Sequence, residues 1–225
     1  MPLAVITGAS AGLGRALASA LLARGWQLVV DARGADRLAR AYAGRPGVLA
    51  LAGDVSDAGH QAELAAAVGD RALDLLINNA STLGPTPLPL LRELEPAALA
   101  AILRVNVLAP LALIQRLLPN LERAGGCVLN VSSDAAVTGY PGWGGYGAAK
   151  AALDQLTRTL AAEQGGVRWY AVDPGDLRTE MHQAAFPGED ISDRPEPATV
   201  VAPLLSLIEG HRPSGRYPIS ELVPA

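Results

Sequence analysis

The feature that most constrains the fold is an alternation of short apolar runs with longer segments of helical periodicity. Short, continuously apolar runs are typical of strands that are covered on both faces. The segments between them are long enough to carry the chain back and begin a parallel neighbour. This order predicts a doubly wound α/β fold, in which a parallel sheet of about seven strands has helices on both faces, in three layers.

The boundaries follow from the same pattern. The predicted strands are 3–6, 27–32, 48–52, 73–77, 128–131, 167–172 and a last one near 216–219, and the predicted helices are 12–24, 35–43, 57–69, 96–118, 146–164 and 198–209. Asp57 and Pro96 are typical helix starts, and Gly165-Gly166 is a typical helix end. The stretch 182–197 is rich in Pro, Gly and acidic residues and predicts a loop. We expect one domain over residues 1–225, since this length suits a single core.

Charge and composition exclude several classes of protein. The net charge is −4 and the 18 basic residues are scattered, so no nucleic-acid partner is expected. The sequence contains no run of 18 apolar residues, the length that a membrane-spanning helix needs. The first residues lead directly into a predicted strand, so we expect a cytoplasmic protein without a membrane partner. The single Cys127 lies in a predicted strand, where a structural role is favoured over a redox one. No metal site is expected.

A glycine-rich turn follows the first predicted strand and opens a helix, with the sequence Thr7-Gly8-Ala9-Ser10-Ala11-Gly12-Leu13-Gly14. Glycines let the backbone approach a pyrophosphate at the positive end of a helix. The spacing differs from Gly-x-Gly-x-x-Gly, and no Lys-Ser/Thr pair follows as in a P-loop. The turn therefore favours a dinucleotide site, and the alternative is a tight strand-to-helix connection.

A second group of polar residues suggests catalysis. Tyr146 and Lys150 lie one helical turn apart on one face, so they can converge on one ligand. Alone this pair could be a surface pair, but Ser133 stands upstream at the end of an apolar strand. Asn106 is a polar residue inside an apolar helical segment. It is either a core Asn bonded to backbone or a functional residue, and a helix irregularity there would accommodate both readings.

Together these motifs resemble the short-chain dehydrogenase/reductase family, over nearly the whole chain. The family's glycine motif has the form Thr-Gly-x-x-x-Gly-x-Gly, and the interval from Ser133 to Tyr146 and the place of Asn106 match as well. The resemblance implies a Rossmann-fold, NAD(P)-dependent oxidoreductase. Such an enzyme, a carbonyl reductase or secondary alcohol dehydrogenase, transfers a hydride between nicotinamide and a ketone or alcohol.

The resemblance also assigns catalytic roles. A ketone that accepts hydride develops negative charge on oxygen, so a nearby group must stabilise this charge and deliver a proton. Tyr146 is implied as the general acid/base, and Ser133 as the group that polarises the carbonyl. Lys150 is implied to bind the nicotinamide ribose, and with the cofactor's positive ring it should lower the pKa of the phenol. Asn106 is implied to hold a water that links Lys150 to solvent.

The cofactor contacts that the resemblance implies lie at the ends of several strands. Asp54 is expected to contact adenine, and Thr179 is expected to receive the carboxamide of nicotinamide. The family normally has Gly where this chain has Ser81, so the geometry near nicotinamide or the substrate depends on this hydroxyl. The complete predicted set is Thr7, Gly8, Ser10, Gly12, Leu13, Gly14, Arg33, Asp54, Val55, Asn79, Ala80, Tyr146, Lys150, Pro174, Gly175 and Thr179.

The end of the second strand decides between NAD and NADP. A carboxylate there would bind the ribose 2′-hydroxyl, whereas an arginine would bind a 2′-phosphate. In the family's register the acidic position falls on Ala32 and the phosphate position on Arg33. Asp31 lies one residue early, and strand alternation should aim it away from the ribose. We therefore favour NADP(H) over NAD, although Ala11 stands where a second basic marker is frequent and Arg15 would have to replace it.

The substrate is expected to be a small carbonyl compound or alcohol. Its predicted contacts are Ser133, Asp134, Tyr140 and Trp143, with walls from 81–86, 134–145 and a lid at 180–197. The resemblance implies a homodimer or homotetramer. Two other functions stay open: a catalytically silent NADP-binding sensor or scaffold, and a non-redox epimerisation or dehydration. The intact catalytic set argues against the first, and the absence of a longer carboxyl-terminal domain argues against the second.

Overall fold

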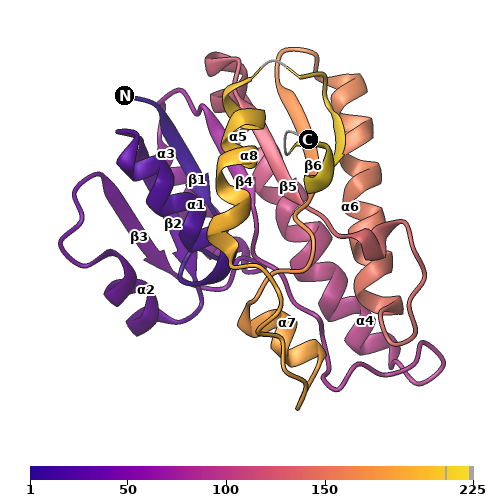
Figure 1. Cartoon of the computed structure of the whole chain (residues 1–225). Coiled ribbons are helices and arrows are strands. Elements are labelled where there is room, and N and C mark those ends of the chain that lie inside the picture. Colours follow the sequence, from indigo (N-terminus) through magenta and orange to yellow (C-terminus); the bar gives the residue numbers. More distant parts are fainter. Residues whose placement is uncertain (211, 223–225) are drawn as a thin grey trace.

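One parallel sheet organises the structure, a computed structural model that describes residues 1–210 and 212–222 (Figure 1). The strand order is β3-β2-β1-β4-β5-β6-β7, and every neighbouring pair is parallel. This confirms the predicted doubly wound α/β fold. The strands are β1 Leu3–Ile6, β2 Gln27–Ala32, β3 Val48–Ala52, β4 Leu75–Asn78, β5 Cys127–Val131, β6 Arg168–Asp173 and β7 Gly215–Pro218.

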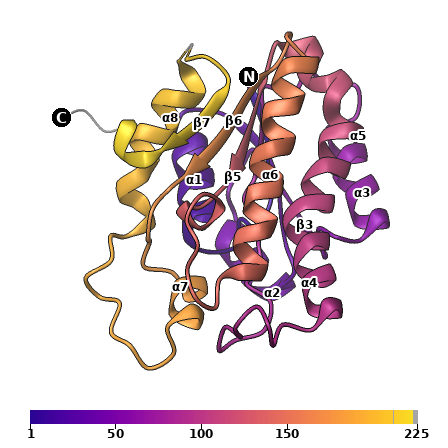
Figure 2. The ribbon, with the colours of Figure 1, turned by 90° about the vertical axis from the view of Figure 1, so that its right-hand side faces the viewer.

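Helices cover both faces of this sheet (Figures 1 and 2). Alternate residues of β1 show why: Ala4 and Ile6 pack in a core with α1 and α8, whereas Leu3 and Val5 pack in a second core with α3 and α5. The helices are α1 Gly12–Ala23, α2 Ala35–Tyr42, α3 Ala58–Val68, α4 Pro96–Leu103, α5 Ala109–Ala124, α6 Gly144–Glu163, α7 Glu180–Ala185 and α8 Val201–Glu209.

The strand order reverses at β1, which pairs with β2 on one side and with β4 on the other. In open α/β sheets the loops diverge at such a switch point and leave a crevice at the carboxyl ends of the strands. The glycine turn after β1 and the Asn78-Asn79-Ala80 segment after β4 both lie at this point. The fold therefore brings the two most informative loops of the sequence together.

The predicted helix 96–118 is wrong in two respects. It is interrupted at Arg104–Leu108 by a π-helical turn, η1, and it continues past Pro119 to Ala124. The interruption surrounds Asn106, whose side chain bonds to a neighbouring loop. The end of α5 is held in place because Leu121 is fully buried. Asn120 also donates to the carbonyl oxygens of Gly69 and Arg71, in the loop between α3 and β4.

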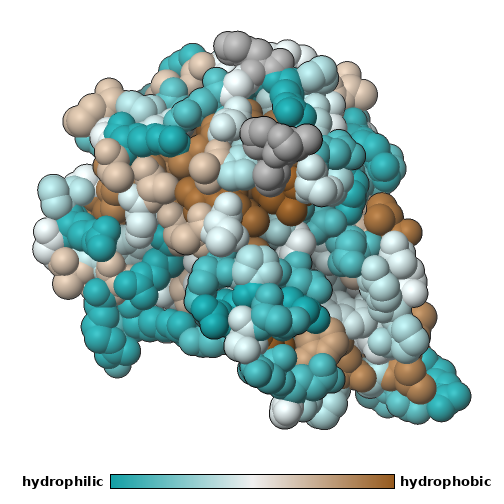
Figure 3. Space-filling view, viewed as in Figure 1, coloured by the Kyte–Doolittle hydropathy of each residue, from teal (hydrophilic) through white to brown (hydrophobic). Residues whose placement is uncertain are grey.

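The predicted loop 182–197 is also partly wrong, because its start belongs to the short helix α7 and its last residue opens a 3₁₀ turn, η3 (Pro197–Val200). Thr179 caps α7, and its hydroxyl accepts a hydrogen bond from the backbone N–H of His182 at 3.1 Å. Arg37 in α2 forms a bidentate ion pair with Glu180, at 2.7 and 2.6 Å. The surface over α2 and α7 is mostly hydrophilic (Figure 3). The other boundaries agree within a few residues.

The continuous helical stretch Pro96–Ala124 is long and apolar enough to cross a membrane, judged by length and composition alone. Its apolar residues include Ile102, Leu113 and Leu117, which are buried in the protein core. A core helix passes the same test of length and composition, and 39% of this apolar window is buried inside the protein.

Candidate active site

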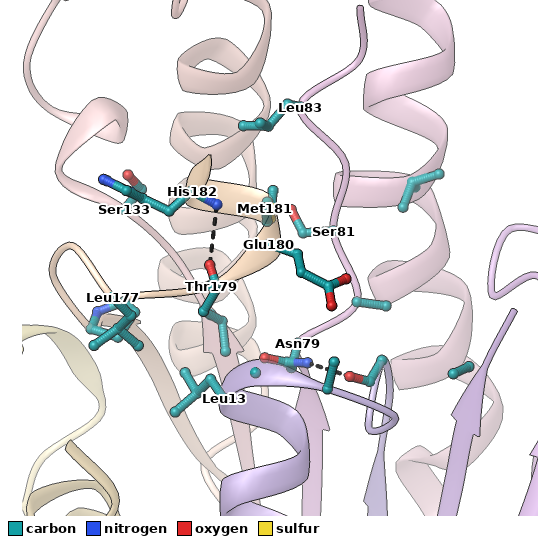
Figure 4. A pocket seen from close by; sticks show the side chains of 18 of the residues that line it. Leu13, Asn79, Ser81, Leu83, Ser133, Leu177, Thr179, Glu180, Met181 and His182 are labelled. Atoms are coloured by element: carbon teal, nitrogen blue, oxygen red, sulfur yellow. Dashed lines mark hydrogen bonds between the residues drawn. The ribbon is translucent and has the colours of Figure 1, made fainter. Parts of the chain in front are cut away.

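A cavity of about 470 Å³ lies at the switch point, along the carboxyl edge of the sheet (Figure 4). Its lining residues include Arg33 and Asp54, which follow β2 and β3, together with Tyr146 of α6 and Thr179, which precedes α7. Most of the predicted cofactor residues line it, namely Gly8, Ser10, Gly12, Leu13, Arg33, Asp54, Val55, Asn79, Ala80, Tyr146, Lys150, Pro174, Gly175 and Thr179. The structure therefore gathers residues from distant parts of the sequence around one space.

Thr7 and Gly14 do not line the cavity but shape the turn that does. The Thr7 hydroxyl accepts hydrogen bonds from the backbone N–H groups of Asn79 and Ala80, both at 3.0 Å. A Cβ at Gly14 would lie 2.5 Å from the Asn79 amide nitrogen and 2.6 Å from the carbonyl oxygen of Gly8. Gly8 itself has φ +67°, which favours glycine. The turn thus leaves its backbone open toward the cavity, and this cradle fits a pyrophosphate.

Asp31 is part of the site although the sequence did not mark it as a site residue. Its carboxylate is buried; Oδ1 accepts a hydrogen bond from Gly8 N–H at 2.8 Å, and Oδ2 lies 3.2 Å from Nε2 of His60. The hydrogen bond to Asp31 raises the pKa of His60, partly offset by burial. Both carboxylate oxygens of Asp31 are therefore engaged by protein groups, and Asp31 fixes the glycine turn.

Arg33 and Asp54 lie together at the β2–β3 end of the cavity. Arg33 is exposed at the end of β2. The backbone N–H and hydroxyl of Ser56 donate to Asp54 at 2.8 and 2.7 Å; they lower the pKa of the Asp54 carboxyl, with a smaller contribution from Arg33. An exposed guanidinium facing a cavity is available to bind an anionic group.

Tyr146 and Lys150 enter the cavity from α6, as their spacing predicts. Lys150 is buried, its Nζ donates to the carbonyl oxygen of Val131 at 2.7 Å, and it lies 5.4 Å from the centroid of the Tyr146 ring. Burial lowers the pKa of Lys150 to about 8, partly opposed by Asp154. The ammonium is thus held on one side by a backbone oxygen and faces the cavity with its remaining donors.

The net effect of the surrounding protein groups is to raise the pKa of the Tyr146 phenol, and the lowering expected from Lys150 together with the cofactor's positive ring stays a prediction. Burial is the largest effect and raises this pKa; the hydroxyls of Ser81 and Ser133 oppose it through hydrogen bonds. Desolvation disfavours the phenolate more strongly than these donors stabilise it. The protein groups therefore favour the protonated phenol, which is the form that acts as an acid.

Asn106 lies beside the cavity in η1 rather than in its wall. Its Oδ1 accepts hydrogen bonds from Thr82 N–H at 2.9 Å and from the Ser81 hydroxyl at 3.2 Å, and its Nδ2 donates to the Thr82 carbonyl at 2.9 Å. The side chain is thus bonded to backbone within an irregular helix, as one of the two readings of the sequence predicted. Ser81 itself lines the cavity, between Asn106 and Tyr146.

The predicted substrate contacts divide into two groups. Ser133, Asp134 and Trp143 line the cavity, and the Trp143 ring packs edge-on against Tyr146 with centroids 5.6 Å apart. Tyr140 does not line it, because its hydroxyl turns to the carboxylate of Asp134 at 2.8 Å on the protein surface.

The cavity is also lined by residues from several segments that the sequence did not indicate, including Arg37, Gly53, Val105, Asp173, Asp176 and Leu177. Their only sequence signal is their position beside predicted site residues. Leu83 also lines the cavity and falls within the predicted wall 81–86. Among residues 1–210 and 212–222, no three His, Cys, Asp or Glu side chains are grouped to hold a metal ion.

Comparison with known proteins agrees with this geometry. The family model described as short chain dehydrogenase matches residues 2–190. The chain is 32% identical over 203 residues to 2-(R)-hydroxypropyl-CoM dehydrogenase of Xanthobacter autotrophicus, covering 85% of this chain and 80% of that protein. It is 37% identical over 201 residues to sepiapterin reductase of Meriones unguiculatus, covering 80% and 76%.

A solved structure shows the same arrangement. The alcohol dehydrogenase of Thermococcus sibiricus, complexed with 5-hydroxy-NADP, superposes with a TM-score of 0.85 at 28% identity, over 97% of this chain and 95% of that one. The sheet topology, the glycine cradle at the switch point and the family match lead to one conclusion. The chain belongs to the short-chain dehydrogenase family of NAD(P)-dependent oxidoreductases.

Proposed function

We propose that this protein is an NADP(H)-preferring carbonyl reductase or secondary alcohol dehydrogenase with Tyr146 as general acid/base. The observation that carries the proposal is one cavity lined by the phenol of Tyr146, the ammonium of Lys150, the hydroxyl of Ser133 and the glycine cradle. A phenol, a cation and a second hydroxyl around one space are the groups that carbonyl reduction requires.

The cofactor would lie along the whole cavity. Gly8, Gly12 and the N-terminus of α1 would hold its pyrophosphate, and Thr179 with Pro174-Gly175 would receive the carboxamide. Bound there, the nicotinamide supplies the hydride for reduction or accepts it in oxidation. The protein's contribution is to orient both reactants and to move the proton.

In the reducing direction Tyr146 would donate its proton to the substrate oxygen, while Ser133 donates a second hydrogen bond to the same oxygen. Lys150, bonded to Val131, would stabilise the phenolate that remains and bind the nicotinamide ribose hydroxyls. The role of Asn106 as a support for a water beside Lys150 stays a prediction. In the oxidising direction Tyr146 must first lose its proton, so this direction should be favoured at high pH.

The preference for NADP(H) rests on charge at the end of β2. Arg33 lines the cavity directly after β2, where its guanidinium would bind a 2′-phosphate, and Ala32 offers no carboxylate for a 2′-hydroxyl. Asp31 is engaged by Gly8 and His60. The NADP analogue in the alcohol dehydrogenase of Thermococcus sibiricus is consistent with this preference.

The substrate class is a ketone or secondary alcohol, and one relative carries the name of a reductase and another of a dehydrogenase. A homodimer or homotetramer and a cytoplasmic location stay predictions. A silent sensor would bind NADPH and show a raised melting temperature without turnover, and this outcome would contradict the proposal.

The test is a panel of ketones with NADPH and with NADH, followed by the nicotinamide absorbance. Tyr146→Phe should lower kcat by at least about 100-fold, because it removes the proton donor. The matched control is Tyr217→Phe on β7, which removes a phenol outside the cavity whose hydroxyl donates to the carbonyl oxygen of Pro213. Full activity of the Tyr146→Phe enzyme would refute the mechanism.

A further inference from the structure

His182 is a cavity residue that the proposed mechanism does not use. It lies on the lid helix α7, which the sequence predicted only as a loop, and it lines the same cavity as Ser133 and Tyr146 (Figure 4). Only 9% of its side chain is exposed. A polar ring so placed contributes to the shape and polarity of the cavity that Ser133 and Tyr146 also line.

The imidazole carries an unpaired nitrogen. Nε2 is buried and has no hydrogen-bond partner within the described part of the chain. Nδ1 is 3.9 Å from Oδ1 of Asp176, which is too long for a hydrogen bond but close enough for an electrostatic attraction. Burying a polar nitrogen without a partner is unfavourable, so such a group within a binding cavity points to a partner on the ligand.

The ring is also held in a fixed position. It packs on Phe186 with centroids 4.9 Å apart, Phe186 packs on Trp143 at 6.0 Å, and Trp143 packs on Tyr146 at 5.6 Å. This row of four rings connects the lid to the catalytic residue. At the backbone, the N–H of His182 donates to the Thr179 hydroxyl. A ring that packs on Phe186 and whose backbone is bonded to Thr179 can discriminate between ligands, because it cannot easily turn away from a mismatched one.

Part of the cavity wall is apolar. Leu83 and Met181 line the cavity from two different segments, and Trp143 adds an aromatic face. These side chains suit a flat or apolar substrate body. The nitrogen of His182 is a polar group separate from the hydroxyls of Ser133 and Tyr146, which contact the reacting oxygen in the proposed mechanism.

We infer that His182 determines substrate specificity by accepting a hydrogen bond from a second polar group of the carbonyl substrate, a hydroxyl or an amide N–H. The Asp176 carboxylate favours the proton on Nδ1, which leaves Nε2 as the acceptor. The substrate class is therefore a ketone with an aromatic or apolar body and one further donor group. This inference rests on the proposed reductase function of the same cavity.

The experiment compares acetophenone with derivatives that carry one hydroxyl, either beside the carbonyl or on the ring. We expect the wild type to prefer at least one hydroxylated ketone by roughly 10-fold or more in kcat/KM, because a site built for a hydrogen bond rejects a substrate that lacks it. His182→Phe keeps an aromatic ring against Phe186 and removes the nitrogen. It should lower kcat/KM for that ketone roughly 10-fold to 100-fold more than for acetophenone.

His182→Gln supplies the second measurement, because its amide oxygen can accept the same hydrogen bond. It should recover part of the preference that His182→Phe loses, which a purely structural role would not produce. An equal loss on both ketones in His182→Phe, or a wild type without any preference, overturns the inference while the reductase function stands. If the wild type reduces no ketone with either cofactor, both the proposed function and this inference fail.

Discussion

Lys150→Met is expected to stabilise the protein while it abolishes turnover. Burial lowers the pKa of Lys150 from 10.5 to about 8, and this difference corresponds to about 3 kcal/mol of unfavourable free energy for the buried charge at neutral pH. The variant loses the hydrogen bond to the carbonyl of Val131, which costs about 1 kcal/mol. Asp154 keeps its ion pair with Arg216 at 3.0 Å. The net gain is about 2 kcal/mol, or roughly 4–8 °C in Tm for a chain of this size.

The stability difference between Lys150→Met and the wild type should also depend on pH. The pKa of Lys150 is lower in the folded chain than in the unfolded one, so below about pH 8 both states are charged and the wild type bears the full cost of burial. Between about pH 8 and 10.5 the folded state loses the proton first. The unfolded state then binds more protons, and the stability of the wild type rises with pH. The advantage of the methionine variant should therefore shrink across this window.

The assay is thermal unfolding followed by circular dichroism at pH 7 and pH 10 without added cofactor, beside a turnover assay with NADPH. Lys150→Arg is the matched control, because its guanidinium stays charged and should bring no gain. A methionine variant that is less stable than the wild type at pH 7 would refute the reasoning. So would a stability advantage over the wild type that is the same at pH 10 as at pH 7.

Three further predictions concern the cofactor and the phenol. Arg33→Ala should raise the KM for NADPH roughly 10-fold to 100-fold and change that for NADH by less than about 2-fold, since it removes a charge-assisted contact; Arg40→Ala, an exposed arginine of α2, is the control, and equal effects on both cofactors would exclude the assignment. Ser81→Gly removes a hydroxyl that lowers the pKa of Tyr146, so the pH profile of kcat/KM for alcohol oxidation should move to higher pH, and an unmoved profile would count against this contact. Gly14→Ala places a Cβ 2.5 Å from a side-chain nitrogen and 2.6 Å from a backbone oxygen; it should lower stability by more than about 1 kcal/mol in thermal unfolding, and a neutral result would show that the turn relaxes.

The parts of the fold that the sequence predicted well are those in which local pattern and burial coincide. β1 and β4 are buried along their whole length, so their residues are apolar except for Asn78 at the end of β4, and their type was evident. The start of β4 was placed two residues early, because Leu73 is fully buried without pairing in the sheet, while Asp74 accepts a hydrogen bond from Leu3 N–H. Burial and strand pairing are distinct properties, and an apolar pattern reports only the first.

The proposed catalytic pair could be predicted for a different reason. Tyr146 and Lys150 share one helix, so their separation along the chain fixes their separation in space. Arg33, in contrast, could be placed only by its register along β2, and its neighbour Asp31 shows how little the register reveals about partners. The bond from Asp31 to Gly8 and its approach to His60 join three segments that are distant in sequence. No local pattern could have indicated them.

The lid helix α7 could not be predicted from a local pattern either, and it carries His182, the residue proposed to determine substrate choice. Six residues form α7, which is too short to be stable from its own propensity. It is held by the Thr179 cap, by the bidentate pair of Arg37 with Glu180, and by the ring contacts of His182. Because Arg37 of α2 lines the cavity together with Arg33, the lid that carries the proposed substrate contact His182 is tied to the proposed cofactor end of the same cavity. Glu180→Gln should therefore weaken binding at the lid and at the cofactor end, and raise the KM for NADPH and the KM for the ketone together. A change in only one of these KM values would show that the two ends act independently.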